Sequence, residues 1–490
     1  MRIAVRVLSW LAFLTAPLVH AQVSAPPSPL DSARARAIDN FISSELVRQQ
    51  IPGIALGIYS RGTILLAKGY GQANVELGVP VRPETVFQSG SIGKQFVSAA
   101  IMMLVEEGKI SLDDSITKYF PAAPATWNPI LIKNLLSHTS GLSEYETPDR
   151  TGPGGPFYLR LDFTEDELAK KIEAMPLEGA PGSNWAYRNT NYVLLGIIIH
   201  KVSGMFYGDV LKELIFKPLG MTSTQIISEA DIVRNRASGY ELHNGQLKNQ
   251  SWVSQTFDST ADGALYFNVL DLAKWDASLY TTQLLKKSSL DRIWTIYPLN
   301  DGKYNPAGYG FGWFIGEQKH HKRIEHSGSW QGFTAQISRY PDDSLTIAVL
   351  TNLDEAHSNP ALIAHVVAGL VIPQLTPTLA AIPDNDPAIA EDLSGVLDEI
   401  TAGNIPHLRL THEFTPVMTP QLLGAIRNQL AAFWPGGTLT LVKREPGPNG
   451  QPASTFRLRK GNDANLIIFS VGSGGKTASF ALATDREFEE

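Results

Sequence analysis

Phe87-Gln-Ser-Gly-Ser91-Ile-Gly-Lys94-Gln-Phe96 combines a Gly-rich turn signal with two chemically reactive side chains, those of Ser91 and Lys94. A strongly apolar run follows at Phe96–Val105 and predicts a buried helix, which Gly108 would end. Ser91 and Lys94 are three positions apart and would therefore share one helical face. A lysine amine beside a serine hydroxyl at a helix N-terminus can serve as the base for a nucleophile.

Two other stretches match the same Ser-x-x-Lys pattern, so the context has to choose among three. Ser115 follows two aspartates and is typical of a turn or cap serine, and Ser473 lies in a Gly-rich hairpin signal. Only Ser91 opens an apolar helix, where burial of Lys94 would lower the pKa of its amine and favour the neutral base. The local pattern alone still leaves a structural role for Ser91 as an alternative.

The composition excludes several classes of function. A chain of 490 residues with 43% hydrophobic and 18% charged residues is typical of a soluble globular protein with two domains. The net charge is −7 and no basic run reaches five residues, so we expect no nucleic-acid partner. Cysteine is absent, which excludes a disulfide framework, a thiolate metal site and a cysteine nucleophile.

The N-terminus predicts a cellular compartment. Arg2 and Arg6 precede the apolar run Val7–Val19, and Val19-His-Ala21 has the small-x-small pattern of a cleavage site. Residues 1–21 are therefore interpreted as a signal peptide, which implies a periplasmic or secreted protein without a stable membrane span after cleavage. The alternatives are an uncleaved anchor and a cytosolic protein whose leader is misinterpreted.

Periodicity predicts an α+β fold. A helix is expected from Ser32 to Gln49, and two hairpins pair 54–59 with 63–68 and 333–340 with 345–351. A second apolar helix is expected at Asn191–Val202. Because strands lie at both ends of this region and helices lie between them, the sheet would be built from the two ends of one domain, residues 32–372.

A second, smaller domain is predicted after a Pro-rich linker. Prolines recur through residues 373–389, which we interpret as the linker. Residues 390–490 then form a small α+β domain of unassigned role, with helices at 390–402 and 420–433 and strands at 438–443, 455–460, 465–471 and 477–483.

Five further motifs follow in the order of a known family. They are Ile132-Lys-Asn-Leu-Leu-Ser-His-Thr-Ser-Gly-Leu142, Tyr187-Arg-Asn189, Lys217-Pro-Leu-Gly-Met221, Tyr309-Gly-Phe-Gly-Trp313 and His326-Ser-Gly328. With the Ser91 motif, they resemble the serine hydrolases related to class C β-lactamases, D-alanyl-D-alanine carboxypeptidases and family VIII-type esterases. The resemblance implies an antiparallel sheet flanked by helices, with a helical subdomain.

The resemblance also implies roles for single residues. Ser91 would be the acylated nucleophile, and Lys94 and Tyr187 would accept and return its proton. Asn189 would hydrogen-bond the substrate amide or orient Lys94. His326 would face the substrate carboxylate or the Tyr187 hydroxyl.

The oxyanion hole would use two backbone N–H groups, those of Ser91 and Ser329. Gly328 would let the substrate approach the strand edge closely. No cofactor and no metal are implied. The segment 262–265 replaces a Gly-rich family segment and is expected to be a loop near the site.

One departure from the β-lactamase pattern limits the substrate. His326 stands where β-lactamases carry lysine, and histidine is mostly neutral near pH 7. We therefore expect weak or no β-lactamase activity and a small peptide, amide or ester substrate. The alternative function is a non-catalytic, penicillin-binding-like scaffold that binds peptide or cell-wall fragments.

Overall fold

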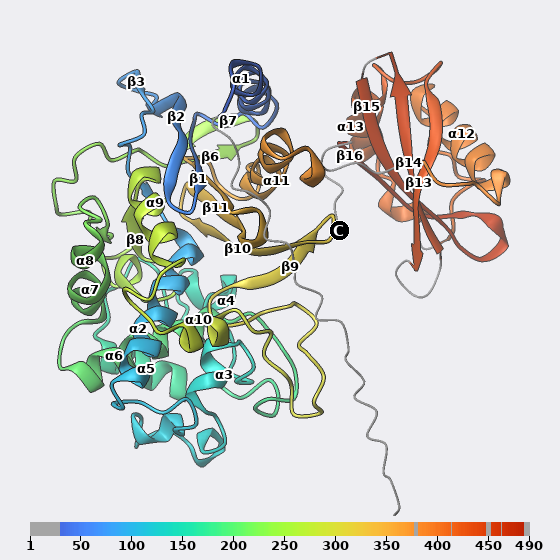
Figure 1. Cartoon of the computed structure of the whole chain (residues 1–490). Helices are drawn as coiled ribbons and strands as arrows, with labels where there is room; N and C mark the ends of the chain where they lie inside the picture. Colours follow the sequence, from blue (N-terminus) through green and yellow to red (C-terminus); the bar gives the residue numbers. More distant parts are fainter. Residues whose placement is uncertain (1–29, 377–380, 413, 447–451, 462, 485–490) are drawn as a thin grey trace, which may run out of the picture.

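The computed structural model describes residues 30–376, 381–412, 414–446, 452–461 and 463–484, so the predicted signal peptide lies outside the described residues. Its centre is a seven-stranded antiparallel sheet with the order β3-β2-β1-β12-β11-β10-β9 (Figure 1). The strands are β1 (Gly53–Ser60), β2 (Thr63–Asn74), β3 (Val79–Pro80), β9 (Phe314–Gln318), β10 (His321–Trp330), β11 (Phe333–Tyr340) and β12 (Leu345–Thr351).

The two ends of this region meet in the middle of the sheet, as predicted. Strand β1 pairs with β12, and Ile54 lies opposite Thr351. Both predicted hairpins are present, β1–β2 around Arg61-Gly62 and β11–β12 around a short 3-10 turn at Pro341–Asp343. The predicted α+β fold is confirmed.

Each face of the sheet has its own hydrophobic core. Helices α1 (Ser32–Arg48) and α11 (Pro360–Val371) cover one face (Figure 1). Alternate residues of β1 explain the division, because Leu56 and Ile58 face these helices while Ala55 and Tyr59 belong to the core on the other side. That second core includes α2 (Lys94–Glu106), α6 (Asn189–Ser203) and α9 (Val269–Ser278).

The remaining elements of this region lie between β2 and β9 in the sequence. Short strands β4 (Phe87–Gln88), β5 (Gln225–Ile226) and β8 (Leu265–Phe267) form a small sheet, and β6 (Tyr240–His243) pairs with β7 (Gln246–Asn249). The other helices are α3 (Ile132–Leu136), α4 (Pro148–Thr151), α5 (Glu165–Glu173), α7 (Tyr207–Leu211), α8 (Lys217–Leu219) and α10 (Lys287–Ile293).

The C-terminal part forms a second antiparallel sheet with the order β13-β14-β15-β16. Its strands are β13 (Thr438–Pro446), β14 (Pro452–Lys460), β15 (Asp463–Val471) and β16 (Thr477–Thr484), and its helices are α12 (Pro387–Thr401) and α13 (Pro420–Leu430). Leu393, Leu397, Phe456 and Ile467 are fully or almost fully buried in a core of its own. The two helices lie beside this sheet in Figure 1.

The predicted linker is shorter than expected at both ends. Leu375 is buried in the core with α1 and α11. Helix α12 begins at Pro387, three residues before the predicted start. The fixed φ of proline suits the first turn of a helix, where no N–H is needed, so this proline starts a helix instead of belonging to the linker.

No single helix within the described ranges is long and apolar enough to cross a membrane. Two helical segments at Asn189–Ser203 and Tyr207–Leu219 reach the length and composition only when they are taken together, and they are bent by 76° relative to each other.

A buried ion pair fastens α9 to the central sheet. Arg339 Nε donates to Asp276 Oδ1 at 2.8 Å, and the two side chains are 1% and 0% exposed. The same carboxylate accepts from Thr346 Oγ1 at 2.8 Å and from the Gly62 backbone N–H at 2.9 Å. One side chain thus joins the helix to both hairpins.

Replacement Asp276→Ala should lower the free energy of unfolding by about 3 to 5 kcal/mol, because it leaves the Arg339 cation buried without its partner. Equilibrium urea denaturation measures the change. Asp291→Ala is the control, since it removes the exposed pair with Lys287 and should change stability little. An equal decrease in the free energy of unfolding in both variants would show that the buried ion pair is no more important than the exposed one.

Candidate active site

Ser91 and Lys94 meet where β4 leads into α2. Ser91 lies in the 3-10 turn Gly90–Gly93, and Lys94 is the first residue of α2. Residues three apart lie directly above one another in a 3-10 turn, which explains why their side chains touch. Lys94 Nζ lies 2.8 Å from Ser91 Oγ.

The other partners of Lys94 determine what its amine can do. Nζ lies 2.8 Å from Asn189 Oδ1 and also donates to the backbone carbonyl of Asp262. Burial lowers the pKa of Lys94 to about 8, although the carboxylates of Asp262, Glu144 and Glu146 act in the opposite direction. A neutral amine has two hydrogens, and the two carbonyl oxygens can accept both. Its lone pair then faces the Ser91 hydroxyl and can accept that proton.

Tyr187 lies beside this pair on the segment that precedes α6. Lys94 Nζ is 5.0 Å from the centre of the Tyr187 ring. Burial raises the pKa of Tyr187 well above its usual value, while the Ser91 hydroxyl acts in the opposite direction. Its buried hydroxyl has no hydrogen-bond partner among the described residues. The site therefore holds a neutral phenol that can donate a proton.

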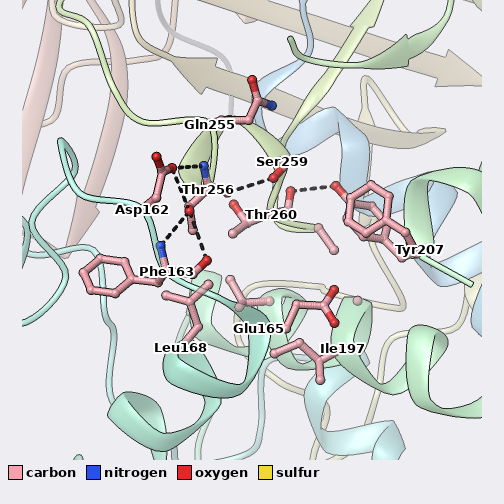
Figure 2. Close-up of a pocket in the computed structure, with 14 residues that line it drawn as sticks. Asp162, Phe163, Glu165, Leu168, Ile197, Tyr207, Gln255, Thr256, Ser259 and Thr260 are labelled. Atoms are coloured by element: carbon pink, nitrogen blue, oxygen red, sulfur yellow. Dashed lines mark hydrogen bonds between the residues drawn. The ribbon is translucent and has the colours of Figure 1, made fainter. Parts of the chain in front are cut away.

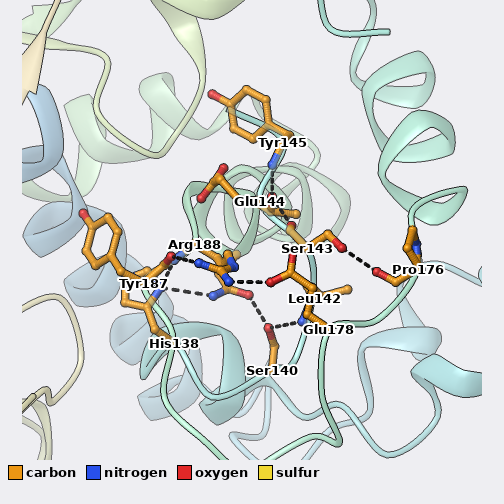
Figure 3. Close-up of polar contacts among 12 residues, drawn as sticks. His138, Ser140, Leu142, Ser143, Glu144, Tyr145, Pro176, Glu178, Tyr187 and Arg188 are labelled. Atoms are coloured by element: carbon orange, nitrogen blue, oxygen red, sulfur yellow. Dashed lines mark hydrogen bonds and ion pairs between the residues drawn. The ribbon is translucent and has the colours of Figure 1, made fainter. Parts of the chain in front are cut away.

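His138 fixes the position of Tyr187 (Figure 3). The two rings lie 4.3 Å apart, and His138 Nδ1 is within hydrogen-bond distance of the Arg188 backbone N–H, at 3.2 Å, and of Asn191 Nδ2, at 3.0 Å. Burial holds the pKa of His138 well below its usual value, so the ring is neutral and Nδ1 is the acceptor. His138 thus connects its own loop to the start of α6.

The loop after His138 brings further acidic groups to the site. Glu144 Oε2 accepts from the Asn189 backbone N–H at 2.6 Å, and its Oε1 accepts from the Glu146 backbone N–H at 2.9 Å. Glu146 Oε2 accepts from Asn189 Nδ2 at 2.7 Å, and Asp262 Oδ2 accepts from Tyr145 at 2.8 Å. Neither glutamate was predicted from the sequence, and Asp262 was expected only as part of a loop, because acidic residues between helices resemble ordinary surface acids.

His326 lies next to Tyr187, with the two ring centres 6.1 Å apart, but its hydrogen bonds go to other groups. Its Nδ1 lies 2.6 Å from the Ser327 carbonyl and its Nε2 lies 3.0 Å from the Tyr309 hydroxyl. Since a carbonyl can only accept, Nδ1 carries the proton and Tyr309 donates to Nε2. Burial and then the Lys94 charge lower the pKa of His326 to about 3. The ring lines the site as a neutral group.

Strand β10 lies directly against the nucleophile turn. A Cβ atom at Gly328 would lie 2.0 Å from the Ser89 carbonyl oxygen and 3.0 Å from the Ser91 nitrogen. Gly90, with a φ of 48°, has the same constraint, because its Cβ would lie 2.3 Å from the Ser329 nitrogen. The backbone nitrogens of Ser91 and Ser329, the two expected oxyanion donors, are therefore brought to the same place in the fold.

Two hollows meet at Ser91. A groove of about 860 Å³ runs past Ser91, Tyr187 and His326 toward the start of α11. A smaller hollow of about 30 Å³, the inner void, shares Ser91, Asn189 and Ser329 with the groove and is also lined by Asp262. Six of the seven predicted site residues line the groove, and the seventh, Lys94, is fully buried in contact with Ser91.

A separate cavity of about 370 Å³ lies behind that loop (Figure 2). Helices α5, α6 and α7 and residues 255–261 enclose it, and Thr260 lines both this cavity and the inner void. Tyr207 donates to the Thr260 carbonyl at 2.9 Å and holds the dividing loop in place. None of the predicted site residues lines this cavity.

The histidines near β10 do not converge on a metal. His321 binds Asp343 at 2.8 Å, and Glu325 binds His365 at 2.7 Å. In the part of the chain that the structure describes, no group of three or more His, Asp or Glu side chains is arranged to hold a metal ion.

This sheet order and this Ser–Lys turn facing strand β10 define the fold of a penicillin-binding-protein-like serine hydrolase. Residues 37–370 match the family model described as Beta-lactamase, and the chain therefore belongs to the β-lactamase family. The family resemblance predicted from the motifs is confirmed.

Two curated relatives match most of this region. "Penicillin-binding protein 4*" of Bacillus subtilis (strain 168) is 30% identical over 320 residues, which are 60% of this chain and 68% of the relative. "Protein flp" of Staphylococcus aureus (strain N315) is 29% identical over 350 residues, 70% of this chain and 68% of the relative.

Solved structures share the fold. The octameric penicillin-binding protein homologue from Pyrococcus abyssi has a TM-score of 0.63 and 25% identity, and the match covers 91% of this chain and 95% of that one. The D-stereospecific amidohydrolase from Streptomyces sp. has a TM-score of 0.58 and 23% identity, with 70% and 99% covered. The second likeness is one of fold alone.

Replacement Gly328→Ala should lower kcat/KM for a p-nitrophenyl ester by about 100-fold or more, because the added methyl group displaces the turn that holds Ser91. Gly316→Ala on the neighbouring strand β9 is the matched control, since its Cβ would meet only Arg323 Nη2 at 4.0 Å. Thermal melting confirms that both variants fold. Near-normal activity of Gly328→Ala would show that the close approach is dispensable.

Proposed function

We propose that this protein is a serine hydrolase that works through an acyl-enzyme at Ser91 on a peptide, amide or ester substrate. The observation that carries the proposal is the contact between Ser91 Oγ and the buried amine of Lys94, whose pKa of about 8 makes a neutral base accessible near physiological pH. The unpartnered Tyr187 hydroxyl beside them supports it.

Acylation begins when Lys94 Nζ accepts the Ser91 proton and Oγ attacks the substrate carbonyl. The oxyanion accepts hydrogen bonds from the N–H groups of Ser91 and Ser329. As the tetrahedral intermediate collapses, Tyr187 donates its proton to the leaving amine or alcohol and recovers one from the Lys94 ammonium. The net change forms the Ser91 ester, breaks the substrate bond and moves the serine proton to the leaving group.

Deacylation runs through the same groups in reverse. Water replaces the leaving group, and its proton passes through Tyr187 to Lys94. The Ser91 ester breaks, Oγ takes the proton back, and the carboxylic acid leaves. Asn189 orients Lys94 throughout, because Oδ1 binds Nζ while Nδ2 is held by Glu146.

The substrate is proposed to be a peptide or amide of the D-amino-acid type, or an ester, with weak or no β-lactamase activity. His326 is neutral at its position, so it supplies no permanent cation for the carboxylate of a β-lactam. The name of the Streptomyces amidohydrolase supports the amide class. Carboxypeptidase and esterase activities, which are known from the enzymes that the motifs resemble, are both included in the proposed function.

The location is proposed to be periplasmic or secreted, on the basis of the leader pattern at residues 1–21. A non-catalytic scaffold is the second candidate function. The contact between Ser91 and Lys94, with the Tyr187 ring 5.0 Å from Lys94 Nζ, favours the enzyme.

A fluorophosphonate probe should label the protein at Ser91, and Ser91→Ala should abolish labelling while the protein remains folded by circular dichroism. A panel of p-nitrophenyl esters, D-amino-acid peptides and a cephalosporin then ranks the substrates. We expect kcat/KM for the cephalosporin to stay below about 10⁴ M⁻¹s⁻¹, the lower end of ordinary enzyme efficiencies. No labelling and no hydrolysis across the panel would favour the scaffold.

The kcat/KM for a neutral ester should rise with pH through about 8 and then level off, because the active base is neutral Lys94. No descending limb is expected up to about pH 10, since burial raises the pKa of Tyr187 above its ordinary value. Glu146 also has a pKa of about 8, so the ascending limb should persist in Glu146→Gln if Lys94 causes it. A flat profile from pH 6.5 to 9 would exclude Lys94 as the base.

A further inference from the structure

Acidic side chains line the hollows at Ser91, whereas Lys94 is fully buried beside Ser91 and lines neither of them. Among the described residues that line the groove and the inner void, none is Lys or Arg. Glu144 and Glu146 line the groove, and Glu146 and Asp262 line the inner void. A substrate carboxylate bound there would face like charges, whereas a substrate cation would be attracted.

Two of these carboxylates keep hydrogen-bonding capacity at the inner void. Asp262 is only 7% exposed, and no described residue hydrogen-bonds its Oδ1, since Tyr145 binds Oδ2. Glu146 uses Oε2 for Asn189 Nδ2, and no described residue binds its Oε1. Glu144 differs, because backbone N–H groups occupy both of its oxygens. Glu144 therefore positions the site, while Glu146 and Asp262 can accept from a ligand.

The lining of the inner void decides which small group it can bind. Its accessible volume of about 30 Å³ is enough to hold a small polar group. A methyl group would also fit, but it would leave two carboxylate oxygens without donors, which is costly. A primary ammonium supplies three N–H donors in the same volume.

From this geometry, which rests on the proposed function, we infer that the substrate has a free primary amine close to its scissile carbonyl. The ammonium group occupies the inner void and donates to Glu146 and Asp262. The rest of the substrate extends along the groove past Tyr187 and His326. The enzyme thus acts on unacylated aminoacyl amides or esters, because an N-acylated nitrogen carries no charge and would leave the two carboxylates without a cationic partner.

Burial of the acidic groups is consistent with this assignment. Burial, with the neighbouring charges of Asp262 and Glu144, raises the pKa of Glu146 to about 8. At pH 7 the carboxyl of Glu146 in the empty site is therefore mostly protonated, and an ammonium group in the void would lower its pKa and favour the ionised carboxylate.

The test compares D-alanine p-nitroanilide, its N-acetyl derivative and p-nitrophenyl acetate at pH 7, where most of the amine is protonated. The wild type should prefer the free amine over the acetylated anilide by about 10-fold or more, since a charged hydrogen bond is lost on acetylation. Glu146→Gln keeps an oxygen for Asn189 and should lower kcat/KM for the amine substrate by about 10- to 100-fold, mainly through KM. Because Glu146 also holds Asn189 and acts on Lys94, hydrolysis of p-nitrophenyl acetate is measured in the same variant, and the loss for the amine substrate should exceed the loss for the acetate by about 10-fold.

Glu317→Gln is the matched control, because it removes one exposed carboxylate on β9 and should leave kcat/KM for both substrates unchanged. Equal or faster turnover of the acetylated anilide by the wild type would overturn the inference. So would an equal loss of both activities in Glu146→Gln.

A binding experiment separates this inference from the proposed function. Calorimetry on Ser91→Ala should detect D-alaninamide but not N-acetyl-D-alaninamide, and Glu146→Gln in the same background should abolish that difference. Equal binding of the two compounds, or binding of neither, overturns the amine assignment. Hydrolysis that persists unchanged in Ser91→Ala overturns the proposed mechanism instead, whatever the calorimetry shows.

Discussion

The active site depends on direct contact between two backbone segments, strand β10 and the turn that holds Ser91. Glycine at 328 and at 90 permits the contact, because a Cβ at either position would lie 2.0 to 2.3 Å from backbone atoms of the other segment. The approach brings the N–H groups of Ser91 and Ser329 together and places Ser91 at the end of the groove. Catalytic geometry here follows from the fit of main chains before any side chain is considered.

The second requirement is a lysine kept partly deprotonated in a dry interior. Desolvation alone would push the pKa of Lys94 down, and the three nearby carboxylates oppose it, which leaves a value of about 8. Asn189 and the Asp262 carbonyl then orient the amine toward Ser91. The acidic groups thus have two effects. They set the basicity of Lys94, and they give the groove its affinity for a cation.

The first hairpin and most of the site residues were predictable from the sequence. Alternating apolar strands and the Arg61-Gly62 turn predicted the first hairpin, and the helix signal after Phe96 placed Ser91 and Lys94 side by side. Family motifs brought Tyr187, Asn189 and His326 to the same site. These features depend on local patterns or on motifs long enough to be specific.

Three features were not predictable, because no local pattern or family motif indicates them. The bond between His326 and Tyr309 could not be predicted, because a histidine has two nitrogens and the motif does not say which partner each one meets. The carboxylates of Glu144 and Glu146 resembled ordinary surface acids until the loop folded over α6. Pro387 looked like a linker residue because proline serves equally well in a linker and in the first turn of a helix.

The pairing of β1 with β12 also has a consequence for biosynthesis. Ser91 is synthesised early, but the sheet that supports its turn closes only after β12 has left the ribosome, because Ile54 must find Thr351. Pairings between such distant segments form slowly, because the entropy of closing the long loop opposes them. A nascent chain that ends before Leu345 contains Ser91 but lacks the central strand β12 and residues 354–361 of the groove. The site is therefore completed only when the whole domain has been made.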